Sequence, residues 1–207
     1  MSVHDFQIVL AKLIASPQLC RRALADEATV FADYILTEKE KNRLHAVLRQ
    51  RGMSACCSLY RMNRVTPLYS QLSNTCTLLG DDLVPIIKAF WKHMSETSLQ
   101  FKEEVLAFGH FLTGSDSAAQ IPYLQEVLQL EIAMNELSYL PEGEVRYLTF
   151  EHDIYAILQA IAAGTLHSAT IGRSDTTYKM CIIDNEIKMD ETVMAHRQTQ
   201  TDTVLLS

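Results

Sequence analysis

The sequence predicts an α+β protein, with an N-terminal multi-helix domain followed by a small C-terminal α/β unit that contains an antiparallel sheet. Two observations lead to this prediction. Apolar residues recur at helical spacing through most of the chain before Pro141. The pattern then changes at Pro141-Glu142-Gly143, and a hairpin pattern occupies Tyr178–Asp190. We therefore expect a helical domain over residues 1–140 and a sheet-plus-helix domain over residues 141–207.

Caps and prolines predict where the first helices begin. Asp5 can cap one helix, and Pro17 suits the first turn of the next. Thr37 and Glu40 have the spacing of a capping box, in which each side chain accepts a hydrogen bond from a free backbone N–H near the other residue. Gly52 is expected to end the helix that this box starts.

Further helices are expected through the middle of the chain. One long helical pattern begins at Ser54, and Pro67 should kink it or split it before Gly80 ends it. The polar segment Gly114–Gln120 is expected to be a loop. Pro122 is then expected to start another long helix.

Strands are expected only after residue 141. Val145–Phe150 alternates weakly and predicts a strand, and His152-Asp153 can start a helix that Gly164 ends. Leu166–Ile171 is interpreted as a second strand, and Gly172–Thr177 as a polar turn.

The hairpin prediction rests on Asp184-Asn185, a short turn whose residues tolerate positive φ. Pairing outward from this turn gives an apolar face and a charged face. The predicted pairs are Ile182 with Ile187, Met180 with Met189, Ile183 with Glu186, Cys181 with Lys188, and Lys179 with Asp190. In the tail, Thr203–Leu206 could add a short strand.

Composition limits the possible functions. The chain has 207 residues, of which 48% are hydrophobic and 21% are charged, which is enough to form a packed core. The net charge of −7 disfavours a general nucleic-acid surface and mildly favours basic partners. Because the sequence shows no signal peptide and no apolar run of membrane-spanning length, we expect a cytoplasmic protein that does not contact a membrane.

Cysteine and histidine spacing gives no catalytic or metal site. The number of cysteines is odd and no C-x-x-C pair occurs, so we expect reduced and mostly buried thiols. A nucleophile at Cys56 or Cys57 is disfavoured because both lie in an apolar helical pattern. No two of the seven histidines are three or four residues apart, so they are interpreted as solvent-facing or capping residues.

A basic cluster surrounds the corner at Gly52. Its members are Arg49, Arg51, Arg61 and Arg64. They could belong to a helix-turn-helix that contacts nucleic-acid phosphates, to a site for an anion or acidic partner, or simply to a solvated positive edge. A nucleic-acid-binding regulator that uses this corner is therefore the alternative function for the chain.

The C-terminal sheet is the strongest candidate site. An exposed sheet edge can accept a partner strand through main-chain hydrogen bonds, although charge or the tail could also protect that edge. The predicted peptide-binding residues are Tyr178, Lys179, Met180, Cys181, Ile182, Ile183, Glu186, Ile187, Lys188 and Met189. The domain over residues 141–207 is thus expected to dock a peptide.

Several segments together resemble a known family, the helical partner subunits of iron-dependent, TIM-barrel peptide-modifying oxygenases. The matching segments, in order, are LTEKEKNRL, SLYRMNRVTPLYSQL, LLGDDLVPIIKAFWKHM, VLAFGHFL, IPYLQEVLQLEIAMNEL and FEHDIYAILQAIAAG. Within that family, the size of the chain and its hairpin most resemble the MbnC family of accessory subunits in methanobactin biosynthesis.

This resemblance implies a heterodimer with an MbnB-like TIM-barrel oxygenase. The iron would lie in that partner, and this chain would hold no cofactor and would not be catalytic alone. The substrate implied is an MbnA-like precursor peptide, whose core cysteine the partner converts to an oxazolone and thioamide. The leader of the precursor would add as a strand to the C-terminal sheet of this chain. A partner subunit for a different ribosomal peptide is a further alternative.

Overall fold

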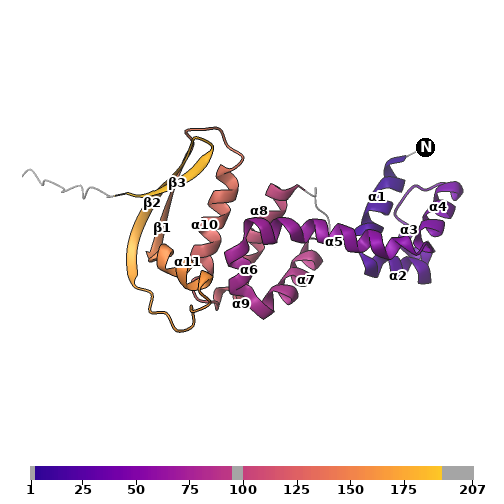
Figure 1. Cartoon of the computed structure of the whole chain (residues 1–207). Helices are drawn as coiled ribbons and strands as arrows, with labels where there is room; N and C mark the ends of the chain where they lie inside the picture. Colours follow the sequence, from indigo (N-terminus) through magenta and orange to yellow (C-terminus); the bar gives the residue numbers. More distant parts are fainter. Residues whose placement is uncertain (1–2, 95–99, 193–207) are drawn as a thin grey trace, which may run out of the picture. The chain divides into compact units, whose positions relative to one another are not determined.

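The computed structural model describes residues 3–94 and 100–192. The chain is mostly helical and ends in a three-stranded antiparallel sheet, so the predicted α+β class is confirmed (Figure 1). It divides into two compact units, Met1–Asn135 and Glu136–Ser207. This division falls inside a helix, ahead of the expected boundary at residue 141.

The first unit is built from helices. They are α1 (Val3–Ala15), α2 (Pro17–Ala25), α3 (Glu27–Phe31), α4 (Glu38–Leu48), α5 (Gly52–Gln71), α6 (Ser73–Leu79), the 3-10 helix η1 (Gly80–Asp82), α7 (Leu83–His93), α8 (Phe101–Thr113), α9 (Asp116–Ala119) and α10 (Leu124–Leu137), whose last residues belong to the second unit.

Two of the predicted helix starts have the expected caps. Pro17 lies in the first turn of α2, and the Ser16 hydroxyl accepts a hydrogen bond from the backbone of Leu19. Thr37 and Glu40 form the capping box of α4, with both reciprocal hydrogen bonds present. The Thr37 backbone N–H and hydroxyl hold the pKa of Glu40 below its usual range.

The break after α5 lies at Leu72 rather than at Pro67. Pro67 is inside α5, and the helix continues to Gln71 before Leu72 leaves the helical region at φ −122° and ψ 45°. A carboxylate from α10 supports the new helix start, because Glu131 accepts hydrogen bonds from the backbone N–H groups of Asn74 at 2.8 Å and Thr75 at 2.9 Å. A negative charge at a helix N-terminus is favourable, so the buried Glu131 stabilises the break.

The polar segment before α10 also differs from its prediction. Gly114–Gln120 contains the short helix α9. The long helix α10 begins at Leu124 rather than at Pro122, since Tyr123 has φ 61°, which is outside the right-handed helical region.

Two apolar clusters stabilise the first unit. The larger cluster joins α5, α6, α7, α8, α9 and α10, with Leu68, Phe90, Val105, Phe108 and Leu128 among its buried members. The other joins α1, α2, α3, α4 and α5, with Val9, Leu13, Ala23, Leu44 and Cys57 among its buried members. Helix α5 contributes to both clusters and so ties them together.

The second unit contains β1 (Val145–His152), α11 (Ile154–Ala162), β2 (Arg173–Ile183) and β3 (Glu186–Glu191). The strand order is β1-β2-β3, with β2 at the centre and both pairings antiparallel. Asp184 and Asn185 have φ values of 55° and 59°, as a type I′ hairpin turn requires. All five predicted cross-strand pairs of the hairpin are present.

The predictions for Leu166–Ile171 and Gly172–Thr177 are wrong. Leu166–Ile171 is not a strand, because the chain turns after α11 with the N–H groups of Ser168 and Ala169 both bonded to the Thr165 carbonyl. Gly172–Thr177 is not a turn, because β2 already begins at Arg173. Strand β1 is long enough to pair with these polar residues, and the Thr149 and Thr177 hydroxyls bond across the strands at 2.8 Å. The possible strand at Thr203–Leu206 lies outside the described residues.

A close approach between α8 and α10 gives a test of this packing. A Cβ atom at Gly109 would lie 2.6 Å from Cδ1 of Ile132. Gly109→Ala should therefore destabilise the first unit by about 1–3 kcal/mol, although alanine is the better helix former. Adding Ile132→Val removes the clashing methyl group and should recover part of the loss. Urea unfolding followed by circular dichroism measures both effects, and equal stability of Gly109→Ala and the unmodified chain would contradict the packing.

Candidate functional site

The ten predicted peptide-binding residues lie on two strands with different surroundings. Tyr178–Ile183 belongs to β2, which is paired with β1 on one side and β3 on the other. Its backbone groups are therefore already used within the sheet. Glu186–Met189 belongs to β3, which is paired on one side only within the described residues. Strand addition in this part of the chain is thus restricted to β3 and the opposite edge, β1.

The outward backbone groups of β3 follow from its register. The Thr192 N–H bonds to the Thr177 carbonyl, and residues of an antiparallel pair alternate between bonding inward and facing outward. Ile187, Met189 and Glu191 therefore direct their N–H and C=O groups away from β2. One of these groups has a side-chain contact, because the Tyr155 hydroxyl donates to the Met189 carbonyl at 3.4 Å.

One face of the sheet is a core surface. Leu148, Phe150, Tyr178, Met180 and Ile182 are all buried on this face. Ring contacts of Tyr178 with Phe150 and with Tyr155 of α11 place that helix over it. Burial raises the pKa of Tyr178, and the nearby carboxylates of Asp153 and Glu191 raise it further. These apolar side chains stabilise the unit and are not available to a peptide.

The β3 edge itself is acidic. Glu186, Asp190 and Glu191 are exposed, and Lys188 is the one exposed base between them on the strand. The side chains of Glu186, Lys188 and Asp190 share the face opposite α11, where Ile183 is also 41% exposed. This edge offers backbone hydrogen bonds beside a net negative charge.

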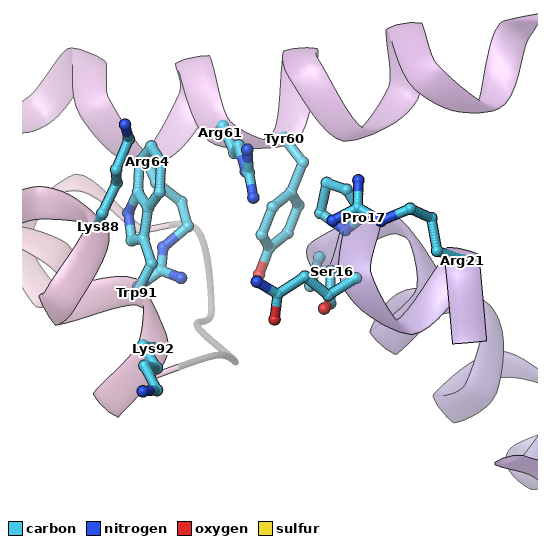
Figure 2. Close-up of a pocket in the computed structure, with 11 residues that line it drawn as sticks. Ser16, Pro17, Arg21, Tyr60, Arg61, Arg64, Lys88, Trp91 and Lys92 are labelled. Carbon is cyan, nitrogen blue, oxygen red and sulfur yellow. The ribbon is translucent and has the colours of Figure 1, made fainter. Parts of the chain in front are cut away.

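The structure also assembles a second site, which we call the basic pocket. It is a hollow of about 660 Å³ within the first unit, between α2, α5 and α7. Figure 2 shows Tyr60 and Arg61 reaching from α5 into the space between Trp91 of α7 and Pro17 of α2. The lining residues are Ala15, Ser16, Pro17, Gln18, Arg21, Tyr60, Arg61, Arg64, Lys88, Trp91 and Lys92. The lining therefore has five basic residues and no acidic one.

A buried ion pair forms one wall of the basic pocket. Arg64 Nε lies 2.7 Å from Glu104 Oε1, and the two side chains are only 2% and 1% exposed. The Arg64 guanidinium also lies 5.2 Å from the ring centre of Phe90 and 5.8 Å from that of Trp91. Arg64 Nη2, Glu104 Oε2 and Trp91 Nε1 are buried without a hydrogen-bond partner in the described part of the chain.

Three of the four predicted cluster arginines line two adjoining hollows. Arg61 and Arg64 line the basic pocket, while Arg51 lines a neighbouring hollow of about 480 Å³ with Arg21 and Arg61. Arg49 lines neither hollow and is exposed at the end of α4. Because Arg61 lines both hollows, Arg51, Arg61 and Arg64 lie along adjoining hollows, and only Arg49 lies outside them.

Sequence reasoning missed Arg21, Lys88, Trp91 and Lys92 as site residues. Lys88 and Lys92 are one helical turn apart in α7 and were a detectable pair, with Trp91 beside them. Arg21 gave no such signal, because it comes from a separate helix far from α7 in sequence.

The thiols and histidines form no alternative site. All five cysteines are free, and only Cys56 is exposed. Burial raises the pKa of Cys20 and of Cys76 to about 12, so both remain protonated at neutral pH. Over residues 3–94 and 100–192, no three His, Cys, Asp or Glu side chains form a group that could hold a metal ion.

Among the helices of residues 3–94 and 100–192, none is both long enough and apolar enough to cross a membrane.

Comparison with known proteins adds no family. No protein-family model matches the chain, and no curated protein matches its sequence.

The buried ion pair gives a test of the pocket wall. Arg64→Met or Glu104→Met should each lower the free energy of unfolding by about 3–5 kcal/mol, because each leaves an uncompensated buried charge. The double variant should lose much less than the sum of the two single losses, since it leaves neither charge. Urea unfolding of all four proteins measures this coupling, and additive losses would show that the two residues do not interact.

Proposed function

We propose that this chain is a non-catalytic subunit of an iron-dependent peptide-modifying oxygenase complex, and that it binds the leader of a precursor peptide at the outer edge of β3. The observation that carries the proposal is the set of outward backbone groups at Ile187, Met189 and Glu191. Such groups accept an added strand without any rearrangement of the sheet.

The side chains around this edge favour a basic peptide. Glu186, Asp190 and Glu191 give the edge a net negative charge, and methanobactin leaders are often rich in lysine. Alternate side chains of an added strand would face the exposed side of the sheet, beside Ile183 and Lys188. Binding at the centre of the edge would displace the Tyr155 hydroxyl from the Met189 carbonyl, a long and exposed hydrogen bond that costs little to exchange.

The resemblance to MbnC supplies the rest of the proposal. The partner is an MbnB-like TIM-barrel oxygenase that holds the iron, and the substrate is an MbnA-like precursor whose core cysteine becomes an oxazolone and thioamide. The contribution of this chain is to hold the leader. Once the leader is bound, the reacting cysteine meets the partner's site at an effective concentration in the millimolar range, which replaces a bimolecular encounter.

The alternative of a nucleic-acid-binding regulator has less support. Arg64 is buried and already paired with Glu104, and Arg61, although exposed, lines the hollow. An extended duplex contacts exposed basic side chains, which this arrangement does not align.

Co-expression tests the proposed complex. The chain produced with an MbnB-like oxygenase and its precursor should yield a 1:1 heterodimer, and mass spectrometry should show modification of the precursor cysteine only when both proteins are present. The chain alone should bind no stoichiometric iron. Tight iron binding with peptide turnover by the isolated chain would sink the proposal.

Proline substitution tests which edge binds the leader. Met189→Pro removes an outward N–H of β3 and should weaken leader binding at least about tenfold, a loss on the order of 1.4 kcal/mol. Tyr147→Pro is the matched control, because Tyr147 has an outward N–H on β1 and its side chain is 63% exposed.

Calorimetric titration of the leader into each variant measures the effect, with circular dichroism to check the fold. Weakening by Tyr147→Pro alone would move the binding site to β1. Unchanged affinity in both folded variants would remove strand addition as the mode of binding.

A further inference from the structure

The basic pocket contains positive charge that the described residues do not neutralise. Arg21, Arg61, Lys88 and Lys92 form no ion pair within residues 3–94 and 100–192, and only Arg64 has a carboxylate partner. Two of the like charges are one helical turn apart on α7, which destabilises that helix. In a chain with a net charge of −7, this concentration of basic residues is an exception. Binding of an anion would relieve the repulsion.

Buried donors in the same pocket lack partners. Arg64 Nη2 and Trp91 Nε1 are both buried and make no hydrogen bond in the described part of the chain, although both residues line the pocket. A buried donor left without a partner costs on the order of 1–3 kcal/mol. Neither atom is accessible from the hollow, so ligand oxygens would meet first the exposed bases Arg21, Arg61, Lys88 and Lys92.

The size of the pocket and its charge distribution define the ligand class. A volume of about 660 Å³ holds a small molecule larger than a single phosphate ion. The bases come from α2, α5 and α7, so they lie on more than one side of the space, and Figure 2 shows Arg61 between the α2 side and the α7 side. Guanidinium and ammonium groups that line one hollow suit phosphoryl groups, which present several oxygens and more than one charge.

We propose that the basic pocket binds a phosphorylated small molecule that carries at least two phosphoryl groups. This inference is independent of the proposed leader binding at β3. A polymer is a poorer fit than a small molecule, because Arg64 is only 2% exposed and lines the hollow.

The pocket contains its own reporter. Trp91 is the only tryptophan of the chain, so intrinsic tryptophan fluorescence reports on this site alone. Titration of the full chain with pyrophosphate should give a saturable change with 1:1 stoichiometry, and calorimetry provides an independent measurement if the emission does not change. Orthophosphate should bind at least about tenfold more weakly, because it makes fewer charged hydrogen bonds. Higher salt should weaken the binding of pyrophosphate.

Matched charge variants distinguish the pocket from the general surface. Lys88→Ala with Lys92→Ala should weaken pyrophosphate binding at least about tenfold, since both substitutions remove charges that line the pocket. Lys39→Ala with Arg43→Ala removes the same number of charges from the exposed face of α4 and should leave the affinity within about twofold. Circular dichroism of both double variants verifies that they fold.

Several results would overturn the proposal. One is the absence of saturable pyrophosphate binding by both methods. Another is an equal loss of affinity in the two double variants. A further contrary result is citrate that binds as tightly as pyrophosphate, because it would show that the pocket does not prefer phosphoryl groups to carboxylates. A single-stranded DNA or polyglutamate probe that binds more tightly than pyrophosphate, and that depends on Lys88 and Lys92, would assign the site to a polymer.

Discussion

The ion pair between Arg64 and Glu104 is the interaction on which the first unit most depends. Removing two charges from water is costly, and the 2.7 Å contact between Arg64 Nε and Glu104 Oε1 offsets part of that cost, so loss of either partner would leave the other charge buried and uncompensated. Arg64 lies in α5 and Glu104 in α8, so the pair fixes the facing sides of these helices. The same guanidinium contacts the ring of Phe90, which belongs to the larger apolar cluster. Core packing and buried charge are therefore coupled at one side chain.

The same constraint shapes the basic pocket. Glu104 pairs with one of the five basic residues, Arg64, whose guanidinium lies 5.8 Å from the ring centre of Trp91. A wall held by a buried ion pair is pre-organised, which would lower the entropy lost on binding of the proposed ligand. Stability and the proposed ligand binding would then depend on the same residue.

Local signals in the sequence predicted local structure well. The sequence predicts the hairpin and each of its five cross-strand pairs correctly, because Asp184 and Asn185 determine the turn and side chains alternate along both strands. The strand predicted at Leu166–Ile171 does not form. Strand β1, residues 145–152, pairs instead with the polar segment that begins at Arg173. The Glu131 cap and the basic pocket join residues far apart in sequence, so local patterns show parts of the pocket, such as Lys88 with Lys92, but not that these parts meet.

The two candidate sites differ in the sign of their charge, and this difference favours separate ligands. The β3 edge is acidic, with Glu186, Asp190 and Glu191 exposed, whereas the lining of the pocket is basic. A lysine-rich strand would be attracted to the edge and repelled by the pocket, and a phosphorylated molecule would have the opposite preference. Specificity between two ligands is a difference of affinities, and like-charge repulsion enlarges that difference without any added contact. If both proposals hold, the opposite charges of the two sites would keep a basic peptide and a small anion from competing for one site.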